Sequence, residues 1–185
     1  TFLSPALIGL YALLKIFDPG PARFSQLRVG RDGRTFTVHK FRTMRADAQE
    51  RLDHLLANDP TAAAEWAQFQ KLKHDPRVTV LGRILRKMSL DELPQLLNIV
   101  RGEMSVIGPR PVTSGEIHRY GAEYPYYTAV RPGVLGLWQV SGRNKLTYEQ
   151  RVAFDVQYVK TWSIWQDIKI LFMAIPVVLL GLGAY

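Results

Sequence analysis

Two adjacent carboxylates, Asp91 and Glu92, follow Ser89 and precede Pro94. Proline fits a helix only in its first turn, because the amide donor that it lacks would have no helical partner there. The pattern therefore predicts a helix over residues 90–100 that carries both acids at its N-terminus. A purely structural interpretation is also open, since acids favour the positive end of a helix and Ser89 with Glu92 matches a capping box.

Cationic residues flank this pair of acids in the sequence. Arg86 lies one turn upstream, and Arg110 stands between Pro109 and Pro111, which hold its backbone almost immobile. A guanidinium on such a loop binds a phosphate group through two hydrogen bonds and loses little entropy. A carboxylate attacks phosphorus when cations screen the repulsion between the two anions. These residue types predict phosphoryl chemistry, in which Mg²⁺ needs only one or two carboxylates plus substrate phosphates.

The elements that must position these residues indicate an α-rich α+β fold. Residues 27–38 alternate polar and apolar side chains around Asp32-Gly33, which predicts a small β-hairpin. Helical periodicity predicts helices over 45–57, from 60 to about 71, over 81–87 and over 148–158. With no repeat and no linker, residues 1–185 are interpreted as a single compact, membrane-associated domain. Its parts are an apolar segment over 1–17, a catalytic body over 18–160 and an interfacial segment over 161–185.

The apolar segments at the two ends are both shorter than the roughly 20 residues of a membrane-spanning helix. Residues 2–17 form either a buried core helix or, as we favour, part of a re-entrant or interfacial hairpin bent at Ser4-Pro5. Near the other end, Trp162 and Trp165 precede an apolar run over 168–185 that Pro176 interrupts. Clustered aromatic residues at the head of such a run favour a helix in the headgroup plane over a core helix.

The net charge of +8 is unevenly distributed, with seven Lys or Arg residues against Asp32 alone over residues 20–45. Such a surface favours anionic partners, namely nucleic acid, acidic lipid headgroups or phosphorylated small molecules. Cysteine is absent, which excludes disulfides and thiolate metal sites. The sequence also lacks the glycine-rich P-loop and dinucleotide-binding patterns.

The chain resembles the bacterial sugar transferase family, the monotopic phosphoglycosyl transferases. The resemblance covers most of the chain from about residue 18, and within the family the chain is similar to undecaprenyl-phosphate galactose or glucose phosphotransferases. The matching stretches are Asp18-Pro-Gly-Pro21, Arg28-Val-Gly-Arg-Asp-Gly33, Lys40-Phe-Arg-Thr-Met44, Asp75-Pro-Arg77, Ser89-Leu-Asp-Glu-Leu-Pro-Gln95, Gly102-Glu-Met-Ser-Val-Ile-Gly-Pro-Arg-Pro111, Arg131-Pro-Gly133, Gly136-Leu-Trp-Gln-Val-Ser-Gly-Arg-Asn144 and the closing Gly-Ala-Tyr185.

The resemblance implies that a hexose-1-phosphate passes from a UDP-sugar to undecaprenyl or another polyprenyl phosphate, with release of UMP. Asp91 would be the nucleophile and a Mg²⁺ ligand, and Glu92 would assist. The expected phosphate-binding residues are Arg86 and Arg110, with Lys40, Arg42, Gln139 and Arg143 as weaker candidates. Ser4-Pro5 would match the break of a re-entrant membrane helix that keeps the site on the cytoplasmic face of the bacterial inner membrane.

The partners so implied are the UDP-sugar, the polyprenyl phosphate and membrane lipids, in the initiation of exopolysaccharide or O-antigen assembly. The oligomeric state stays open, with a homodimer as one option. The alternatives are a UDP-sugar hydrolase and a non-catalytic scaffold that binds anionic lipid. A nucleic-acid-binding module is not expected, because no reader motif is present and Asp91-Glu92 would repel a phosphate backbone.

Overall fold

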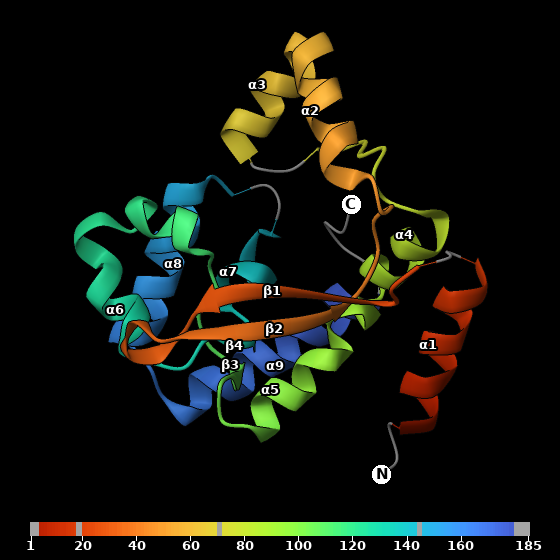
Figure 1. Cartoon of the computed structure of the whole chain (residues 1–185). Helices are drawn as coiled ribbons and strands as arrows, with labels where there is room; N and C mark the ends of the chain where they lie inside the picture. The colour runs from red at the N-terminus through yellow and green to blue at the C-terminus, as the bar shows by residue number, and fades with distance from the viewer. Residues whose placement is uncertain (1–3, 18–19, 70–71, 144–145, 180–185) are drawn as a thin grey trace. The chain divides into compact units, whose positions relative to one another are not determined.

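The computed structural model describes residues 4–17, 20–69, 72–143 and 146–179 (Figure 1). The chain divides into two compact units, of which the first comprises residues 1–24, 40–94 and 185 and the second residues 25–39 and 95–184. The described residues are mostly helical with two small sheets, as the α-rich α+β prediction requires. The single-domain interpretation stays a prediction, because this division does not tell whether the two units fold separately.

The chain passes from one unit to the other twice within a β-hairpin, between residues 24 and 25 and between residues 39 and 40. Its strands are β1 (Arg23–Val29) and β2 (Thr35–Phe41), which form a two-stranded sheet. The predicted turn is confirmed: Asp32 and Gly33 have φ angles of 58° and 73°, and Gly30 N–H donates to the carbonyl of Arg34 at 2.8 Å. Glycine and aspartate adopt this left-handed conformation more readily than other residues, which is why they occupy the turn.

The first unit is built from helices around two small apolar clusters. One cluster is formed by Leu14, Ala22, Phe41 and Leu85, and the other by Leu52, Ala62 and Leu72. Figure 1 shows α2 and α3 side by side, joined at the predicted break Asp59-Pro60. The helices are α1 (Ser4–Phe17), α2 (Ala48–Asn58), α3 (Pro60–Phe69), α4 (Val80–Lys87) and the 3₁₀ helix Leu90–Gln95.

The second unit packs helices against a short parallel strand pair, in which Ser105 of β3 lies opposite Gly133 of β4. Helix α9 contacts both strands. Asn98 is fully buried and ties this unit together, since its amide group donates to the carbonyl of Thr37 and to the carboxylate of Glu103. The elements are α5 (Leu96–Val100), β3 (Ser105–Ile107), the 3₁₀ helices Ser114–Arg119 and Gly121–Glu123, α6 (Tyr124–Thr128), β4 (Gly133–Leu135), α7 (Leu137–Ser141), α8 (Tyr148–Lys160) and α9 (Ile164–Leu179).

Most predicted helices are confirmed with shifted ends, and two details differ. The helix expected over 90–100 is a 3₁₀ helix followed by the separate α5, and Pro94 lies inside the 3₁₀ part. Pro176 does not end the C-terminal helix, because α9 continues to Leu179. The end predicted near residue 71 for the helix that starts at residue 60, residues 18–19 and residues 180–185 lie outside the described residues.

The two apolar ends form helices that leave much apolar surface exposed. In α1, Leu14 is fully buried while Ile8, Ile16 and Phe17 are more than two thirds exposed. The predicted break at Ser4-Pro5 is described only on its downstream side, where α1 begins at Ser4. Among the helices of the described residues, none combines the length and the apolar character that a bilayer span requires.

Candidate active site

The backbone turns sharply just before the two acids. Ser89 has a φ angle of 55°, a left-handed conformation that costs a non-glycine residue about 1–2 kcal/mol. This conformation ends α4 and starts the 3₁₀ helix that carries Asp91 and Glu92 in its first turn. A capping box requires an extended residue at the position of Ser89, and the Ser89 N–H donates instead to the carbonyl of Arg86 at 3.1 Å. The capping-box interpretation is therefore wrong, and locally strained backbone is typical of functional sites.

Glu92 forms an ion pair with a second predicted site residue. The Nζ atom of Lys40, the penultimate residue of β2, donates to Oε1 of Glu92 at 2.6 Å. The two side chains are only 20% and 16% exposed, so water screens the pair incompletely. Asp91, the neighbouring residue, is 9% exposed. The structure thus brings Lys40 into contact with one of the paired acids, although 52 residues separate them.

Arg86 lies on helix α4, in the same unit as Asp91 and Glu92. This helix makes a close backbone contact with Thr43. Thr79 caps the helix by accepting a hydrogen bond from Gly82 N–H at 3.0 Å, and Thr79 N–H donates to the carbonyl of Thr43. A Cβ atom at Gly82 would overlap the carbonyl oxygen of Thr43, so only glycine permits this approach. Arg86 Nε then donates to Thr43 Oγ1 at 2.9 Å, which fixes the base of its guanidinium.

Arg42 lies next to Gly20. Its side chain is buried, and its backbone N–H donates to the carbonyl of Ala22 at 2.8 Å. Gly20 has a φ angle of 127°, and a Cβ atom there would overlap the Arg42 guanidinium. Gly20 is therefore favoured for its conformation, and a larger residue there would also displace the Arg42 guanidinium.

The Asp75-Pro-Arg77 motif has a structural explanation. Arg77 donates to both carboxylate oxygens of Asp75, at 2.8 and 2.7 Å, and Arg77 also stacks over the ring of Trp66. Burial works to raise the pKa of Asp75, but the hydrogen bonds from Arg77 hold this pKa below its ordinary value. The Arg77 carbonyl accepts from Arg45 N–H, so the motif supports the chain that leads from β2 into α2.

The other three predicted residues belong to the second unit. Arg110 follows β3 between two prolines, Gln139 lies in α7, and Arg143 follows this helix with a φ angle of 50°. The Oε1 atom of Gln139 is buried and has no hydrogen-bond partner among the described residues. The predicted site residues are thus divided between the units: Lys40, Arg42, Arg86, Asp91 and Glu92 lie in the first, and Arg110, Gln139 and Arg143 in the second.

The donor groups around Asp91 can be compared with the needs of Mg²⁺. Within the described ranges, no group of three or more His, Cys, Asp or Glu side chains could hold a metal ion by itself. Mg²⁺ commonly takes one or two carboxylates and completes its octahedron with water and substrate phosphates. A carboxylate pair such as Asp91-Glu92 fits this mode of binding, in which the substrate supplies the remaining oxygens.

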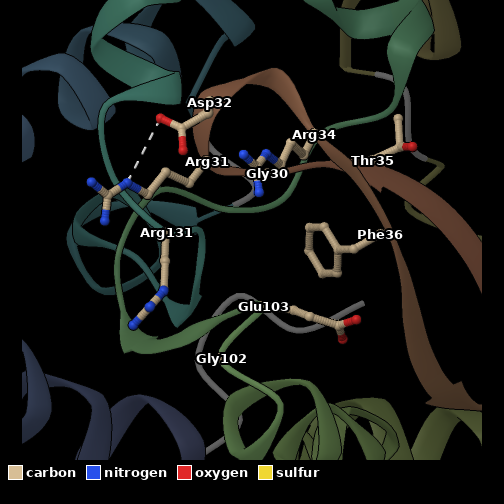
Figure 2. Close-up of a pocket in the computed structure, with 9 residues that line it drawn as sticks. All are labelled: Gly30, Arg31, Asp32, Arg34, Thr35, Phe36, Gly102, Glu103 and Arg131. Carbon is tan, nitrogen blue, oxygen red and sulfur yellow. Dashed lines mark ion pairs between the residues drawn. The ribbon is translucent and has the colours of Figure 1, made fainter.

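A cavity that the sequence did not predict lies at the turn of the hairpin, within the second unit. Its volume is about 350 Å³, and it is lined by arginines from the hairpin and by Arg131. Figure 2 shows Arg31 and Arg131 on one side and the Phe36 ring on the other, with Arg31 paired to Asp32 at 3.8 Å. None of the predicted site residues lines this cavity, although Arg31, Glu103 and Arg131 lie in stretches that match the family.

Comparison with known protein families matches almost the whole sequence to one family. The model of the bacterial sugar transferase family matches residues 1–181. The chain therefore belongs to the bacterial sugar transferase family, as the motifs predict.

Three relatives show how much of a protein the chain corresponds to. It is 55% identical over 182 residues to the undecaprenyl-phosphate galactose phosphotransferase of Salmonella typhimurium, covering 98% of this chain and 38% of that protein. It is 54% identical over 185 residues to the UDP-galactose-lipid carrier transferase of Erwinia amylovora, covering 100% of this chain and 39% of the relative. The exopolysaccharide production protein ExoY of Rhizobium meliloti is 50% identical over 182 residues, which are 98% of this chain and 80% of that protein. The chain thus spans about two fifths of the first two relatives.

Proposed function

We propose that this chain transfers a hexose-1-phosphate from a UDP-sugar to undecaprenyl phosphate, with release of UMP. The observation that carries the proposal is the strained Ser89 turn, which presents Asp91 beside a Glu92–Lys40 ion pair in a unit that also holds Arg86. The Salmonella relative is named an undecaprenyl-phosphate galactose phosphotransferase, and the Erwinia relative a UDP-galactose-lipid carrier transferase. UDP-galactose is therefore the first donor to test.

The proposed reaction has two displacement steps at one phosphorus atom. A carboxylate oxygen of Asp91 attacks the β-phosphorus of the UDP-sugar, and the bond from this phosphorus to the bridging oxygen breaks, so that UMP leaves. An oxygen of the lipid phosphate then attacks the same phosphorus, and the Asp91 carboxylate leaves. The product is a lipid-linked diphosphate sugar, and the enzyme returns to its starting state.

The surrounding residues have separate roles in this proposal. Arg86, anchored through its Nε atom to Thr43, would bind phosphate oxygens through the rest of its guanidinium. Lys40 holds Glu92 in a fixed position, from which Glu92 orients the groups beside Asp91. Mg²⁺ bound by Asp91 and the diphosphate would neutralise charge on the phosphate oxygens. Arg110 in the second unit would also bind phosphate, with Arg42, Gln139 and Arg143 as weaker candidates.

We further propose that the chain works on the cytoplasmic face of the bacterial inner membrane. The support is the apolar surface of the two terminal helices, each considered by itself. Ile16 and Phe17 of α1 are 69% and 71% exposed, and Trp165 and Phe172 of α9 are 76% and 66% exposed. Contiguous exposed apolar side chains of this size mark interaction surfaces, and helices of this kind insert into the headgroup region.

The test is UMP release from a panel of UDP-sugars by detergent-solubilised protein, with and without undecaprenyl phosphate. We expect one donor to support continuous UMP release only when the lipid is present. UMP release that continues at the same rate without lipid would favour hydrolysis of the UDP-sugar instead. No UMP release from any donor, with lipid present, would reject transfer altogether.

A further inference from the structure

The backbone that follows Arg110 is fixed by four successive hydrogen bonds within the second unit. The Pro111 carbonyl accepts from Arg28 Nη1 at 3.1 Å, and Thr113 N–H donates to Glu116 Oε2 at 2.7 Å. Between them, the Val112 carbonyl accepts from Val29 N–H at 2.9 Å, and Val112 N–H donates to the hydroxyl oxygen of Tyr127 at 3.1 Å. Each backbone group from Pro111 O to Thr113 N–H therefore has an identified partner.

The backbone before Arg110 is fixed as well. Gly108 N–H donates to the carbonyl of Leu135 at 2.9 Å, and the Pro109 carbonyl accepts from Gly133 N–H at 2.8 Å. These bonds tie the residues that follow β3 to both ends of β4. Arg110 is consequently a single residue between two stretches of immobile backbone.

The hydroxyl of Tyr127 completes the bridge between Val29 and Val112. Residues paired in this way in an antiparallel bridge normally exchange two backbone hydrogen bonds. Here only Val29 N–H reaches its partner directly, and the second bond runs through the Tyr127 hydroxyl, which accepts from Val112 N–H and donates to the Val29 carbonyl at 2.5 Å. A hydroxyl can do both because it is donor and acceptor at once.

The Tyr127 hydroxyl is shielded from water, so a water molecule cannot readily take over its hydrogen bonds. Tyr127 is 2% exposed, and Val29 and Val112 are 2% and 5% exposed. Burial raises the pKa of Tyr127 above its ordinary value, so the hydroxyl keeps the proton that it donates. Loss of the hydroxyl would leave a buried amide and a buried carbonyl without a partner, and the loop would have to move to restore their hydrogen bonds.

We propose that Tyr127 is a positioning residue, which holds the Arg110 loop in the geometry that binds the phosphate groups of the substrate. Arg28 assists by donating a hydrogen bond to the carbonyl of Pro111, and an ion pair with Glu116 at 3.2 Å holds the Arg28 side chain in place. The inference rests on the proposed function, because it assumes that Arg110 binds phosphate. When the loop is held in place, phosphate binding by Arg110 loses little entropy. A displacement of the guanidinium by about 1 Å can cost about 100-fold in rate.

The first experiment tests the bridge without reference to activity. In Tyr127→Phe, we expect hydrogen–deuterium exchange of the Val112 amide to accelerate by more than tenfold relative to the wild type. Tyr120→Phe is the matched control, since Tyr120 is equally buried in the same apolar cluster but its hydroxyl donates to Asp155. The control should leave exchange at Val112 unchanged, and an unchanged rate in Tyr127→Phe would overturn the inference.

The second experiment asks whether Tyr127 acts through Arg110. We expect Tyr127→Phe to raise the KM for the UDP-sugar about 10- to 100-fold with a smaller change in kcat, and to have less than a twofold effect in an Arg110→Ala background. An equal loss in both backgrounds would assign Tyr127 to stability alone and overturn the inference. Wild-type protein that releases no UMP would instead reject the proposed function, and with it the role given to Arg110.

Discussion

The segment around Asp91 and the loop around Arg110 are held in two different ways. Asp91 lies on a short 3₁₀ helix, two residues after the strained Ser89. The contacts near it are made by side chains, such as Lys40 with Glu92 and Arg86 with Thr43. Arg110 stands between two stretches of chain whose backbone groups are hydrogen-bonded.

This difference matches the two kinds of chemistry proposed. A nucleophile must form and break a bond, and side-chain contacts allow small movements during this cycle. A phosphate-binding guanidinium gains most from a backbone that does not move, because less entropy is lost when it binds. The comparison therefore predicts that changes near Asp91 act on the rate, whereas changes near Arg110 act on substrate affinity.

The largest effect is expected at Asp91 itself. Asp91→Asn should lower UMP release on the order of 10⁴-fold or more, since an amide cannot form the covalent bond to phosphorus. The control is Asp53→Asn, in which an exposed acid of α2 that accepts from Gln49 is changed in the same way. Steady-state assays in which Asp91→Asn keeps more than a tenth of wild-type activity would end the nucleophile assignment.

A pH-dependent effect on stability is expected beside Arg110, at Asp155. Burial raises the pKa of Asp155 from 3.8 to about 7, although the Tyr120 hydroxyl at 2.7 Å and the Arg110 charge work to lower it. The folded state thus keeps a proton that the unfolded state loses. The contribution to stability is complete below about pH 4 and disappears as the pH rises through about 7.

Thermal or urea unfolding across this range checks the sign. The stability of the wild type relative to Asp155→Asn should fall by up to about 1.4 kcal/mol per pH unit between pH 4 and 7, and then level off. A difference that grows in the opposite direction would show that Asp155 is charged in the folded protein.

A smaller effect on stability is expected where α4 meets Thr43. Gly82→Ala should lower the free energy of unfolding by about 1–3 kcal/mol, because the new methyl group overlaps backbone and α4 must shift. It should also slow UMP release, since α4 carries Arg86 and leads into the Asp91 segment. Gly9→Ala in α1 is the control: nothing lies within 4 Å of its added Cβ, so a gain of about 0.5–1 kcal/mol is expected. Equal effects at both glycines would show that the α4 contact is not specific.

The smallest effect concerns the Lys40–Glu92 pair. Lys40→Met and Glu92→Gln should each destabilise the protein, and the double variant should be less destabilised than their sum by about 1 kcal/mol. Chemical denaturation of all four proteins measures this coupling energy. Strict additivity would mean that the 2.6 Å contact contributes nothing to stability.

Local patterns predicted much of the fold. The hairpin, most helices and the break at Asp59-Pro60 followed from alternation, periodicity and proline placement. The parallel pair β3–β4 was not predicted, since strands of three residues carry no detectable periodicity and their pairing depends on distant chain. The capping box that the spacing of Ser89 and Glu92 matched is absent, because Ser89 adopts a left-handed conformation that sequence spacing does not reveal.

The candidate site was predicted in its residue types but not in its contacts. The motifs identified Lys40 and Glu92 separately, yet only the fold shows that they form an ion pair. Tyr127 was not identified, because it is one of three tyrosines in the short helix α6 and no motif distinguishes it. Its role becomes visible only when its hydroxyl is found between Val29 and Val112.

The most direct test of the proposed mechanism is to trap the phosphosugar on the protein. The protein is incubated with the UDP-sugar that it uses, without lipid acceptor, and is then digested and analysed by mass spectrometry. The mechanism predicts one peptide that carries a hexose phosphate on Asp91, which disappears when undecaprenyl phosphate is added and is absent from Asp91→Asn. An active enzyme that carries the modification on another residue, or that never forms it while still releasing UMP, would contradict the account.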